Sequence, residues 1–406
     1  MTSIIARISF ISIMIFSTTA CLSNDEITTD QTDNHHIISS QITLDKTRTA
    51  KAPSHHINGK FRNPYLPEDF QPSTISFLKA RFFDDMQWPD EPENYREHWQ
   101  AADLKKIHNP DFNKAQATLI GHSTVLLQYK GINILTDPMF SERPFLTQSF
   151  GPKRYTPVAL TIEQLPNIDI IVISHNHYDH LDVNSVKALT SSSFIKNTNG
   201  TQPLWLVPLG LKKWFAQFDV TNIQEMDWWQ KIEIDTFSKP EFKSKLTIQT
   251  LPSQHWSRRS IFDTNESLWA SWAFIWPATD DETIQHEEIQ SEKFTAWFGG
   301  DTAYNPYQFK EIGQALGEVD LAMIPIGAYE PRWFMKTQHV NPLDAVEIFK
   351  DINAKSAFGI HWNTFVLTAE AVDEPPKALE RALQKNGLGA ELFQAMDIGD
   401  TWIQAN

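Results

Sequence analysis

Two β-sheets packed face to face, with helices on the outside, are the layered α/β fold class that this sequence predicts. Three observations support it. Short β-branched and apolar runs recur across residues 117–360, the first of them follow one another directly, and the later ones alternate with segments of helical pattern. This order is typical of stacked sheets that helices cover. With 406 residues, of which 41% are hydrophobic, the chain can bury the large core that such layers need.

The earliest strands are short, and Lys130 and Gly131 form the turn of a predicted hairpin. Strands are expected at residues 117–120, 125–129, 132–136, 168–174, 203–207, 246–251, 269–276, 294–298, 321–326 and 357–360. Helices are expected at residues 183–189, 211–218, 342–350 and 376–385. The last helix opens on a proline, which the first turn of a helix tolerates.

The N-terminal residues have the pattern of an export signal. Residues 1–20 combine Arg7, a nine-residue apolar run at 8–16 that is too short to span a bilayer, and small residues up to Ala20. Cys21, the only cysteine, follows as the acylated cysteine of a bacterial lipoprotein does; ordinary secretion with cleavage nearby is the alternative. We therefore expect an exported protein, lipid-anchored to a bacterial membrane on the periplasmic side, at the outer membrane rather than the inner one.

Residues 21–57 are polar and show neither helical nor strand periodicity, so we expect a flexible tether ahead of one folded domain at 58–406. The histidine pairs at 35–36 and 55–56 lie in this tether, and we expect them to bind nothing in particular. The formal net charge of the chain is −15. Such a surface repels phosphate backbones, so no nucleic-acid partner is expected.

One loop is dense in metal-binding side chains. His175, His177, Asp179 and His180 lie within six residues, directly after the predicted buried strand at 168–174. Imidazole and carboxylate are ligands of zinc and its first-row neighbours, and the alternating spacing can divide the donors between two ions. Four donors at the exposed end of one strand are hard to explain as chance, so this loop is predicted to bind metal.

Three later strands also end in a donor. His255 follows the strand at 246–251, Asp301 follows a Gly-Gly pair after the strand at 294–298, and His361 follows residue 360 directly. Glycines without a Cβ allow close approach to a crowded centre. Each donor alone has a structural explanation, as a hydrogen-bonded histidine or a turn-forming aspartate. Together with the loop they make seven ligands for two metals.

This HxHxDH loop followed by His, Asp and His at strand ends resembles the metallo-β-lactamase superfamily, which has an αββα sandwich with a dinuclear site at one edge. Within it, longer segments are similar to the N-acyl-phosphatidylethanolamine-hydrolysing phospholipase D family. The segments are GHSTVLLQ (121–128), GPKRY (151–155), ISHNHYDHLD (173–182), WLVPLG (205–210), DWW (227–229), PSQHWSRR (252–259), LWASW (268–272), FGGDTAY (298–304), IPIGAYEPRWFMKTQHVNP (324–342) and IHWNTF (360–365).

The resemblance implies a ligand set. The first zinc is implied to bind His175, His177 and His255, the second Asp179, His180 and His361, and Asp301 is implied to bridge them. Iron or manganese suits the same nitrogen and oxygen donors.

The implied activity is hydrolysis of a phospholipid. Two cations about 3.5 to 4 Å apart can share a water and turn it into a hydroxide near neutral pH. That hydroxide would attack phosphorus in line and release phosphatidic acid and an N-acylethanolamine. We count Asp179, Asp301 and His339 as the catalytic residues. The lipid anchor would bring residues 58–406, the hydrolase domain, to the membrane, although a single anchor binds weakly.

Several residues are candidates for substrate contact, each with a structural alternative. Tyr178 is expected to donate to a phosphoryl oxygen or to pack under the loop. Gln338 and His339 are expected to place the phosphate or the leaving group, with a hydrogen bond to a ligand as the alternative for His339. The remaining expectations are that His122, Asp137 and Asp182 support the ligands and that Arg258, Arg259 and Arg332 either counter the lipid phosphate or are ordinary surface arginines.

Two other function classes stay open. The same metal centre serves lactonases, β-lactamases and nucleases; a bridging Asp301 disfavours the β-lactamases, and the acidic charge disfavours the nucleases. The second class is a non-catalytic envelope protein that only stores metal, and a complete set of seven donors argues against it.

Overall fold

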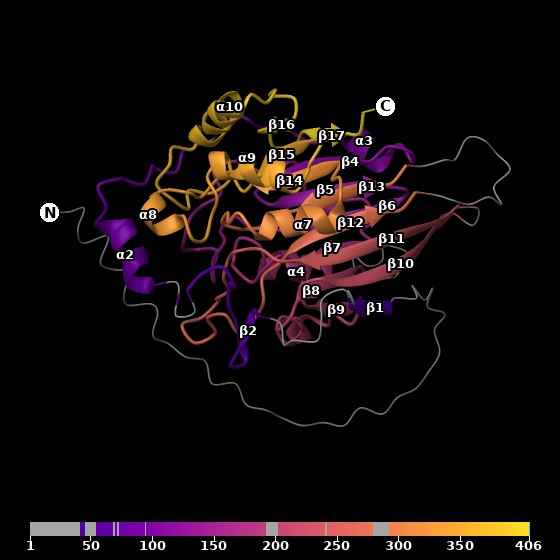
Figure 1. Ribbon diagram of the computed structural model, residues 1–406, viewed down its shortest axis with the longest axis horizontal. Coiled ribbons are helices and arrows are strands. Elements are labelled where there is room, and N and C mark those ends of the chain that lie inside the picture. Colours follow the sequence, from indigo (N-terminus) through magenta and orange to yellow (C-terminus); the bar gives the residue numbers. More distant parts are fainter. Residues whose placement is uncertain are drawn as a thin grey trace. The chain divides into compact units, whose positions relative to one another are not determined.

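The computed structural model describes residues 41–44, 54–67, 70, 73–93, 95–191, 202–239, 242–278 and 292–405. Two large mixed sheets, with helices beside them, make up the domain (Figure 1). The predicted signal peptide and Cys21 lie outside the described residues. Among the residues that are described, no helix is both long and apolar enough to cross a membrane.

The seven-stranded sheet carries the early part of the domain. In sheet order its strands are β17 (Thr401–Ile403), β4 (Gln116–Gly121), β5 (Thr124–Tyr129), β6 (Ile132–Thr136), β7 (Ile170–Val172), β8 (Leu204–Pro208) and β9 (Ile223–Met226). Pairing is antiparallel from β17 to β6 and parallel from β6 to β9. Strands β4, β5, β7 and β8 are buried along their whole length, which explains their nearly continuous apolar sequence.

The eight-stranded sheet carries most of the later part. In sheet order its strands are β1 (Gln41–Leu44), β10 (Gln230–Lys239), β11 (Phe242–Leu251), β12 (Ser271–Trp276), β13 (Phe294–Phe298), β14 (Leu321–Pro325), β15 (Ala357–Ile360) and β16 (Phe393–Gln394). The strands from β1 to β13 pair antiparallel, and those from β13 to β16 pair parallel. A separate hairpin pairs β2 (His56–Ile57) with β3 (Lys60–Phe61).

The helices are short and connect or cover the strands. They are α2 (Thr74–Phe82), α3 (Leu104–His108), α4 (Val183–Leu189), α6 (Lys212–Phe215), α7 (Gln308–Leu316), α8 (Arg332–Met335), α9 (Pro342–Asp351) and α10 (Glu374–Asn386), with 3₁₀ turns η1 (Ile162–Gln164) and η2 (Ala216–Phe218). Figure 1 shows α7 and α9 beside the later strands of the eight-stranded sheet. Asn341 caps α9 by accepting the backbone N–H of Asp344, and Pro342 occupies its first turn.

Alternate residues of β12 divide between two cores. Trp272, Phe274 and Trp276 belong to the core shared with the seven-stranded sheet, whereas Ala273 faces the core beneath α7, α9 and α10. This alternation is what a strand buried on both faces requires. Across the first core the indole Nε1 of Trp272 donates to the carbonyl of Ile173 at 3.0 Å, which joins the two sheets beside the metal loop.

The predicted layered fold is confirmed. Predicted and observed bounds are identical for strands 132–136, 294–298 and 357–360 and for helix 183–189. The expected helix at 211–218 is present as α6 continued by the 3₁₀ turn η2. Strands β9, β10, β16 and β17 and helices α2, α3, α7 and α8 were not expected from the sequence.

The tether prediction is wrong for residues 41–44 and 54–57. Strand β1 adds to the edge of the larger sheet through β10, and the hairpin that begins at His56 hydrogen-bonds to the domain through Phe61 N–H and Asn265 O at 2.9 Å. Polar composition misled the prediction, because backbone pairing at a sheet edge needs no apolar side chains. The ordered part of the chain therefore begins before residue 58.

The hydrogen bond across the core gives the first prediction. Trp272→Phe should lower the free energy of unfolding by about 1 kcal/mol more than Trp276→Phe, because only the former removes a hydrogen bond between the sheets. Trp276 is a matched control: it is buried on the same strand, and among the described residues its Nε1 has no partner. Urea unfolding of both variants measures the difference, and equal losses would show that the bond contributes nothing.

Candidate metal centre

Strand ends from both sheets bring the predicted ligands to one place. The contributing residues are His122 after β4, Asp137 after β6, His175 to His180 after β7, His255 after β11, Asp301 after β13 and His361 after β15. All of the seven predicted ligands are in this cluster. Gly300 lets the sheets approach here: its φ is +56°, and a Cβ in its place would lie 2.5 Å from the Cβ of Ser174.

The first group consists of His175, His177, His255 and Asp301. The Nδ1 of His177 lies 2.9 Å from the Nε2 of His175 and 3.2 Å from the Nε2 of His255. The Oδ2 of Asp301 is 3.8 Å from the Nε2 of His175 and 3.7 Å from that of His255. One donor atom from each residue therefore faces the same small volume.

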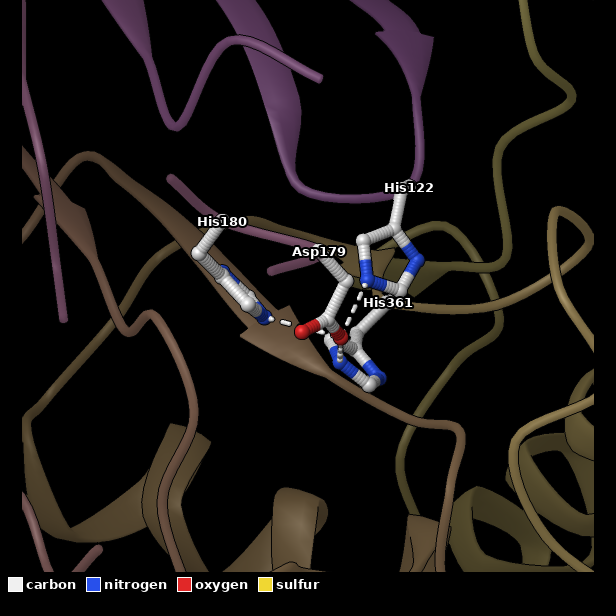
Figure 2. Close-up of side chains that lie close together, drawn as sticks. All are labelled: His122, Asp179, His180 and His361. Carbon is white, nitrogen blue, oxygen red and sulfur yellow. Dashed lines mark hydrogen bonds and ion pairs between the residues drawn. The ribbon is translucent and has the colours of Figure 1, made fainter. Parts of the chain in front are cut away.

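The second group is centred on Asp179. Figure 2 shows the imidazoles of His122, His180 and His361 gathered around its carboxylate. The Oδ2 of Asp179 lies 3.1 Å from the Nε2 of His122, 3.3 Å from that of His361 and 3.5 Å from that of His180. Sequence reasoning gave His122 only a supporting role, and its contact with Asp179 across 57 residues has no signal in the spacing of either motif.

Asp301 lies between the two groups. Its Oδ2 is 3.2 Å from the Nε2 of His180, and its Oδ1 is 3.2 Å from the Nε2 of His361. Because the same carboxylate also faces His175 and His255, it lies close to imidazoles of both groups. The side chain is 2% exposed, so water does not compete for these contacts.

The donors fit divalent cations better than they fit one another. Among the described residues the buried Nε2 of His180 and Oδ1 of Asp301 have no partner with hydrogen-bond geometry. The nearest charged atoms are 3.2 Å away: the Oδ2 of Asp301 from the former, and the Nε2 of His361 from the latter. Zinc–nitrogen bonds of 2.0–2.1 Å in a tetrahedral site place ligand atoms roughly 3.3 Å apart, close to the separations here. Unpaired buried polar atoms are costly, and a cation would satisfy them together.

Electrostatics keep several of the imidazoles neutral, the form that binds metal. Burial and neighbouring imidazoles hold the pKa of His175 and of His177 well below its usual value. Burial lowers the pKa of His255 to about 4 and that of His122 to about 3. Lone pairs on these rings are therefore available at neutral pH.

In the second group the carboxylates raise the pKa of two imidazoles, those of His361 and His180. Burial alone would lower the pKa of His361, but Asp301 and Asp179 outweigh it and raise the pKa to about 9. The pKa of His180 likewise lies well above its ordinary value because Asp301 and Asp179 offset its burial. In turn, His180 holds the pKa of Asp301 and of Asp179 well below the usual range despite burial. Both acids are ionised.

Hydrogen bonds from outside fix which nitrogen of each ring faces the centre. His180 donates from Nδ1 to Asp137 at 2.7 Å, and His255 donates from Nδ1 to the carbonyl of Gln338 at 2.9 Å. His175 donates from Nδ1 to the hydroxyl of Ser174, which itself donates to Asp137 at 2.5 Å. His175 and His255, whose pKa values are low, thus turn a bare Nε2 inward, whereas the Nε2 of His180 faces the carboxylates of Asp301 and Asp179. The supporting role expected of Asp137 agrees with this geometry.

Arg259 fastens the loop that carries His175, His177, Asp179 and His180. Its Nη1 donates to the carbonyls of Asn176 and Leu181 at 2.8 and 2.7 Å, and its guanidinium stacks on Tyr178, 4.1 Å from the ring centroid. The hydroxyl of Tyr178 donates to the carbonyl of Arg259 at 2.8 Å. The geometry thus favours packing under the loop for Tyr178, and a phosphate-binding role for Arg259 is not supported.

Two further expectations need correction. Asp182 was expected to orient a ligand imidazole, but it caps α4 and accepts hydrogen bonds from Ser141 and Ser185. Arg332 was a candidate for the lipid phosphate, but it pairs with Asp344 at 2.7 Å and donates to the carbonyl of His339 at 2.9 Å. The side chains of Asp182 and Arg332 are therefore both engaged in contacts within the protein.

The predicted substrate residues at 338–339 differ in orientation. The side-chain amide of Gln338 donates to the carbonyl of Phe334 at 3.2 Å, and its backbone carbonyl holds His255, so its structural contacts are with the protein. The Nε2 of His339 lies 3.9 Å from the Oδ2 of Asp301, and the side chain is 12% exposed. His339 therefore lies at the accessible side of the centre.

Asp137 supplies the second prediction. Asp137→Asn should weaken metal binding roughly 10- to 100-fold, because the amide cannot hold His180 and Ser174 as the carboxylate does. Asp169→Asn is the control: this partly buried carboxylate accepts the backbone N–H of Asn133 at 2.8 Å, at the opposite end of β7. Competition with a zinc-sensitive dye measures the affinities. Unchanged affinity in Asp137→Asn would remove the orienting role.

Comparison with known proteins identifies the family of this chain. The family model for the beta-lactamase superfamily domain matches residues 132–362. The N-acyl-phosphatidylethanolamine-hydrolyzing phospholipase D 1 of Caenorhabditis elegans is 39% identical over 309 residues, which cover 73% of this chain and 79% of the worm protein. The mitochondrial N-acyl-phosphatidylethanolamine-hydrolyzing phospholipase D of Saccharomyces cerevisiae is 34% identical over 271 residues, covering 66% of this chain and 52% of the yeast protein.

Among solved structures, an isothiocyanate hydrolase from Delia radicum gut bacteria superimposes with a TM-score of 0.50 at 16% identity, covering 71% of this chain and 98% of that one. This likeness concerns the fold alone. The matches to the family model and to the worm and yeast proteins go further than the fold. The chain belongs to the β-lactamase superfamily, as a relative of the N-acyl-phosphatidylethanolamine-hydrolyzing phospholipases D, and is a metal-dependent hydrolase.

Proposed function

We propose that this protein is a dinuclear zinc phosphodiesterase of the phospholipase D type, which cleaves N-acyl-phosphatidylethanolamine to phosphatidic acid and an N-acylethanolamine. The observation that carries the proposal is Asp301, whose carboxylate faces imidazoles of both donor groups. The 39% identity to the worm phospholipase D supports the choice of substrate within the superfamily.

The residues divide into two sets. His175, His177 and His255 would hold one ion, Asp179, His180 and His361 the other, and Asp301 both. Bound divalent ions would lower the pKa of a water and offset negative charge on the phosphoryl oxygens. Iron or manganese is compatible with the same donors.

The protein's own residues prepare the site for this chemistry. Asp137, Ser174 and the carbonyl of Gln338 hold three ligand rings in place before substrate arrives, so little reorganisation is needed during the reaction. Burial of the ligands excludes bulk water from one side. His339, which faces Asp301 from the accessible side, is placed to contact the phosphate or the leaving group.

Apolar side chains near the centre suit a lipid substrate. Trp256 contacts the ligand His177 with ring centroids 4.5 Å apart, and the next residues lead to Phe262, which is 81% exposed. Arg258 of the same loop reaches Thr74 at the start of α2, where Ile75 is 80% exposed. Exposed apolar surface of this kind marks contact with a membrane or a partner. It favours a phospholipid over a small water-soluble lactone.

We place the protein at the bacterial cell envelope, on the periplasmic side and at the outer membrane. The support is the signal-like run at residues 8–16 followed by Cys21. A single lipid chain binds membranes weakly, so apolar contacts of the domain itself would add to the attachment.

His177→Ala should abolish turnover and leave the fold intact, because the substitution removes one donor of the first group and nothing from either core. The measurement is mass-spectrometric detection of both products from vesicles that contain N-acyl phosphatidylethanolamine, with circular dichroism as the folding check. His108→Ala is the control, since that exposed ring hydrogen-bonds to the carbonyl of Gln164 at 3.1 Å and belongs to neither donor group. Full activity of His177→Ala would contradict the proposal.

Chelation should remove activity, and added zinc should restore it, because the catalytic donors act through bound cations. The same preparation is assayed on N-acyl phosphatidylethanolamine, bis(p-nitrophenyl) phosphate, an acyl lactone and nitrocefin. Hydrolysis of the phospholipid that disappears with chelator supports the proposal. Turnover of the lactone alone would show that the protein is a lactonase and that the proposed phospholipase activity is wrong.

A further inference from the structure

We infer that His55, His56 and Asp227 form a separate binding site for a first-row divalent cation such as zinc. This outer site shares no residue with the centre described above. It lies where the β2–β3 hairpin meets the loop between β9 and β10, and Asp227 is 172 and 171 residues from the two histidines in sequence.

The geometry is that of three donors converging. The Nε2 of His55 lies 2.7 Å from the Oδ1 of Asp227, and the Nε2 of His56 lies 2.9 Å from the Oδ2 of the same carboxylate. One donor atom from each of the three residues lies within 4.8 Å of the others. His55 lies in the turn directly before β2 and His56 is the first residue of that strand, so the two Nε2 atoms can face the same carboxylate.

The surroundings hold these donors in place. His55 is 5% exposed, and its ring stacks on Trp228 with centroids 4.2 Å apart. Trp228 in turn donates its indole N–H to the carbonyl of Trp269 at 2.6 Å and its backbone N–H to Asp227 at 2.8 Å. Two of the three donors are therefore fixed by the core, which lowers the entropy cost of binding an ion.

The same groups can also hydrogen-bond without metal, each imidazole N–H donating to one carboxylate oxygen. A tautomeric shift of each proton to Nδ1 would turn both Nε2 lone pairs toward Asp227 and create a set of two imidazoles and one carboxylate. That set is one that zinc and neighbouring metals bind. The side chain of His56 is 38% exposed, so water can reach the site and complete the coordination.

Occupancy would fasten the hairpin to the domain. The chain continues from the hairpin to Asn63, whose Nδ2 donates to the carbonyl of His255 at 2.7 Å, so the fastened segment extends to a residue of the catalytic centre. Binding to the folded state alone raises stability by mass action. An ion at the outer site would therefore stabilise the N-terminal edge of the domain beside the centre.

The test counts zinc bound by the full chain after the central centre has been saturated. Wild type should bind one more equivalent of zinc than His56→Ala, measured by isothermal titration and by elemental analysis after gel filtration. His56 is exposed, so its loss should leave the fold unchanged by circular dichroism.

Two controls define the site. His98→Ala removes a histidine that pairs with a single carboxylate, Asp397, at 2.8 Å, and should keep the extra equivalent. The double variant His35→Ala/His36→Ala should keep it as well. The inference is overturned if wild type binds no extra zinc, if His56→Ala still binds it, or if the double variant loses it.

Discussion

The structure depends on a concentration of buried donors that leaves several polar atoms without a partner. The Nδ1 of His177 lies within hydrogen-bond distance of the Nε2 atoms of His175 and His255, at 2.9 and 3.2 Å. Among the described residues the buried Nε2 atoms of His177 and His180 have no hydrogen-bond partner, which is costly in the absence of a cation. Asp301 adds a carboxylate whose two oxygens face different groups of rings. A divalent cation would satisfy these buried atoms together. Because each donor follows a strand of one sheet or the other, the packing of the two sheets is what brings the donors together.

The fold solves it by controlling the rings from behind. A chain of hydrogen bonds runs from His175 through Ser174 to Asp137 and on to His180, so one buried carboxylate sets the tautomers of two ligands. Arg259 ties both ends of the metal loop through backbone carbonyls. These contacts fix the orientation of the donors in the centre. The residues that orient the ligand rings are buried behind them, whereas the side chain of His339 is partly exposed.

Much of this could be predicted from the sequence, because periodicity and strand ends are local signals. All seven predicted ligands lie in the centre, and the layered fold is as expected. Strand β10 alternates Ile232 and Ile234 with polar residues, and α7 buries Phe309, Ile312 and Leu316, so both elements have the apolar spacing of their type. Gly313 weakens the helical pattern of α7 in the sequence. Its place is structural, because a Cβ there would collide with the backbone of Asp351. Two sets of contacts could not be predicted from the sequence, since they join segments that only the folded chain brings together. They are the contact between His122 and Asp179 and those of His55 and His56 with Asp227.

X-ray absorption at the metal edge of the purified protein, combined with elemental analysis, is the most direct test of metal binding at this centre. We expect bound divalent metal with a nearest shell of nitrogen and oxygen at about 2.0–2.1 Å and the outer-shell scattering of several imidazoles, as for zinc. Loss of that shell in Asp301→Asn would assign the metal to the two donor groups. A metal-free protein that hydrolyses its substrate at full rate in the presence of chelator would show that the centre works without metal.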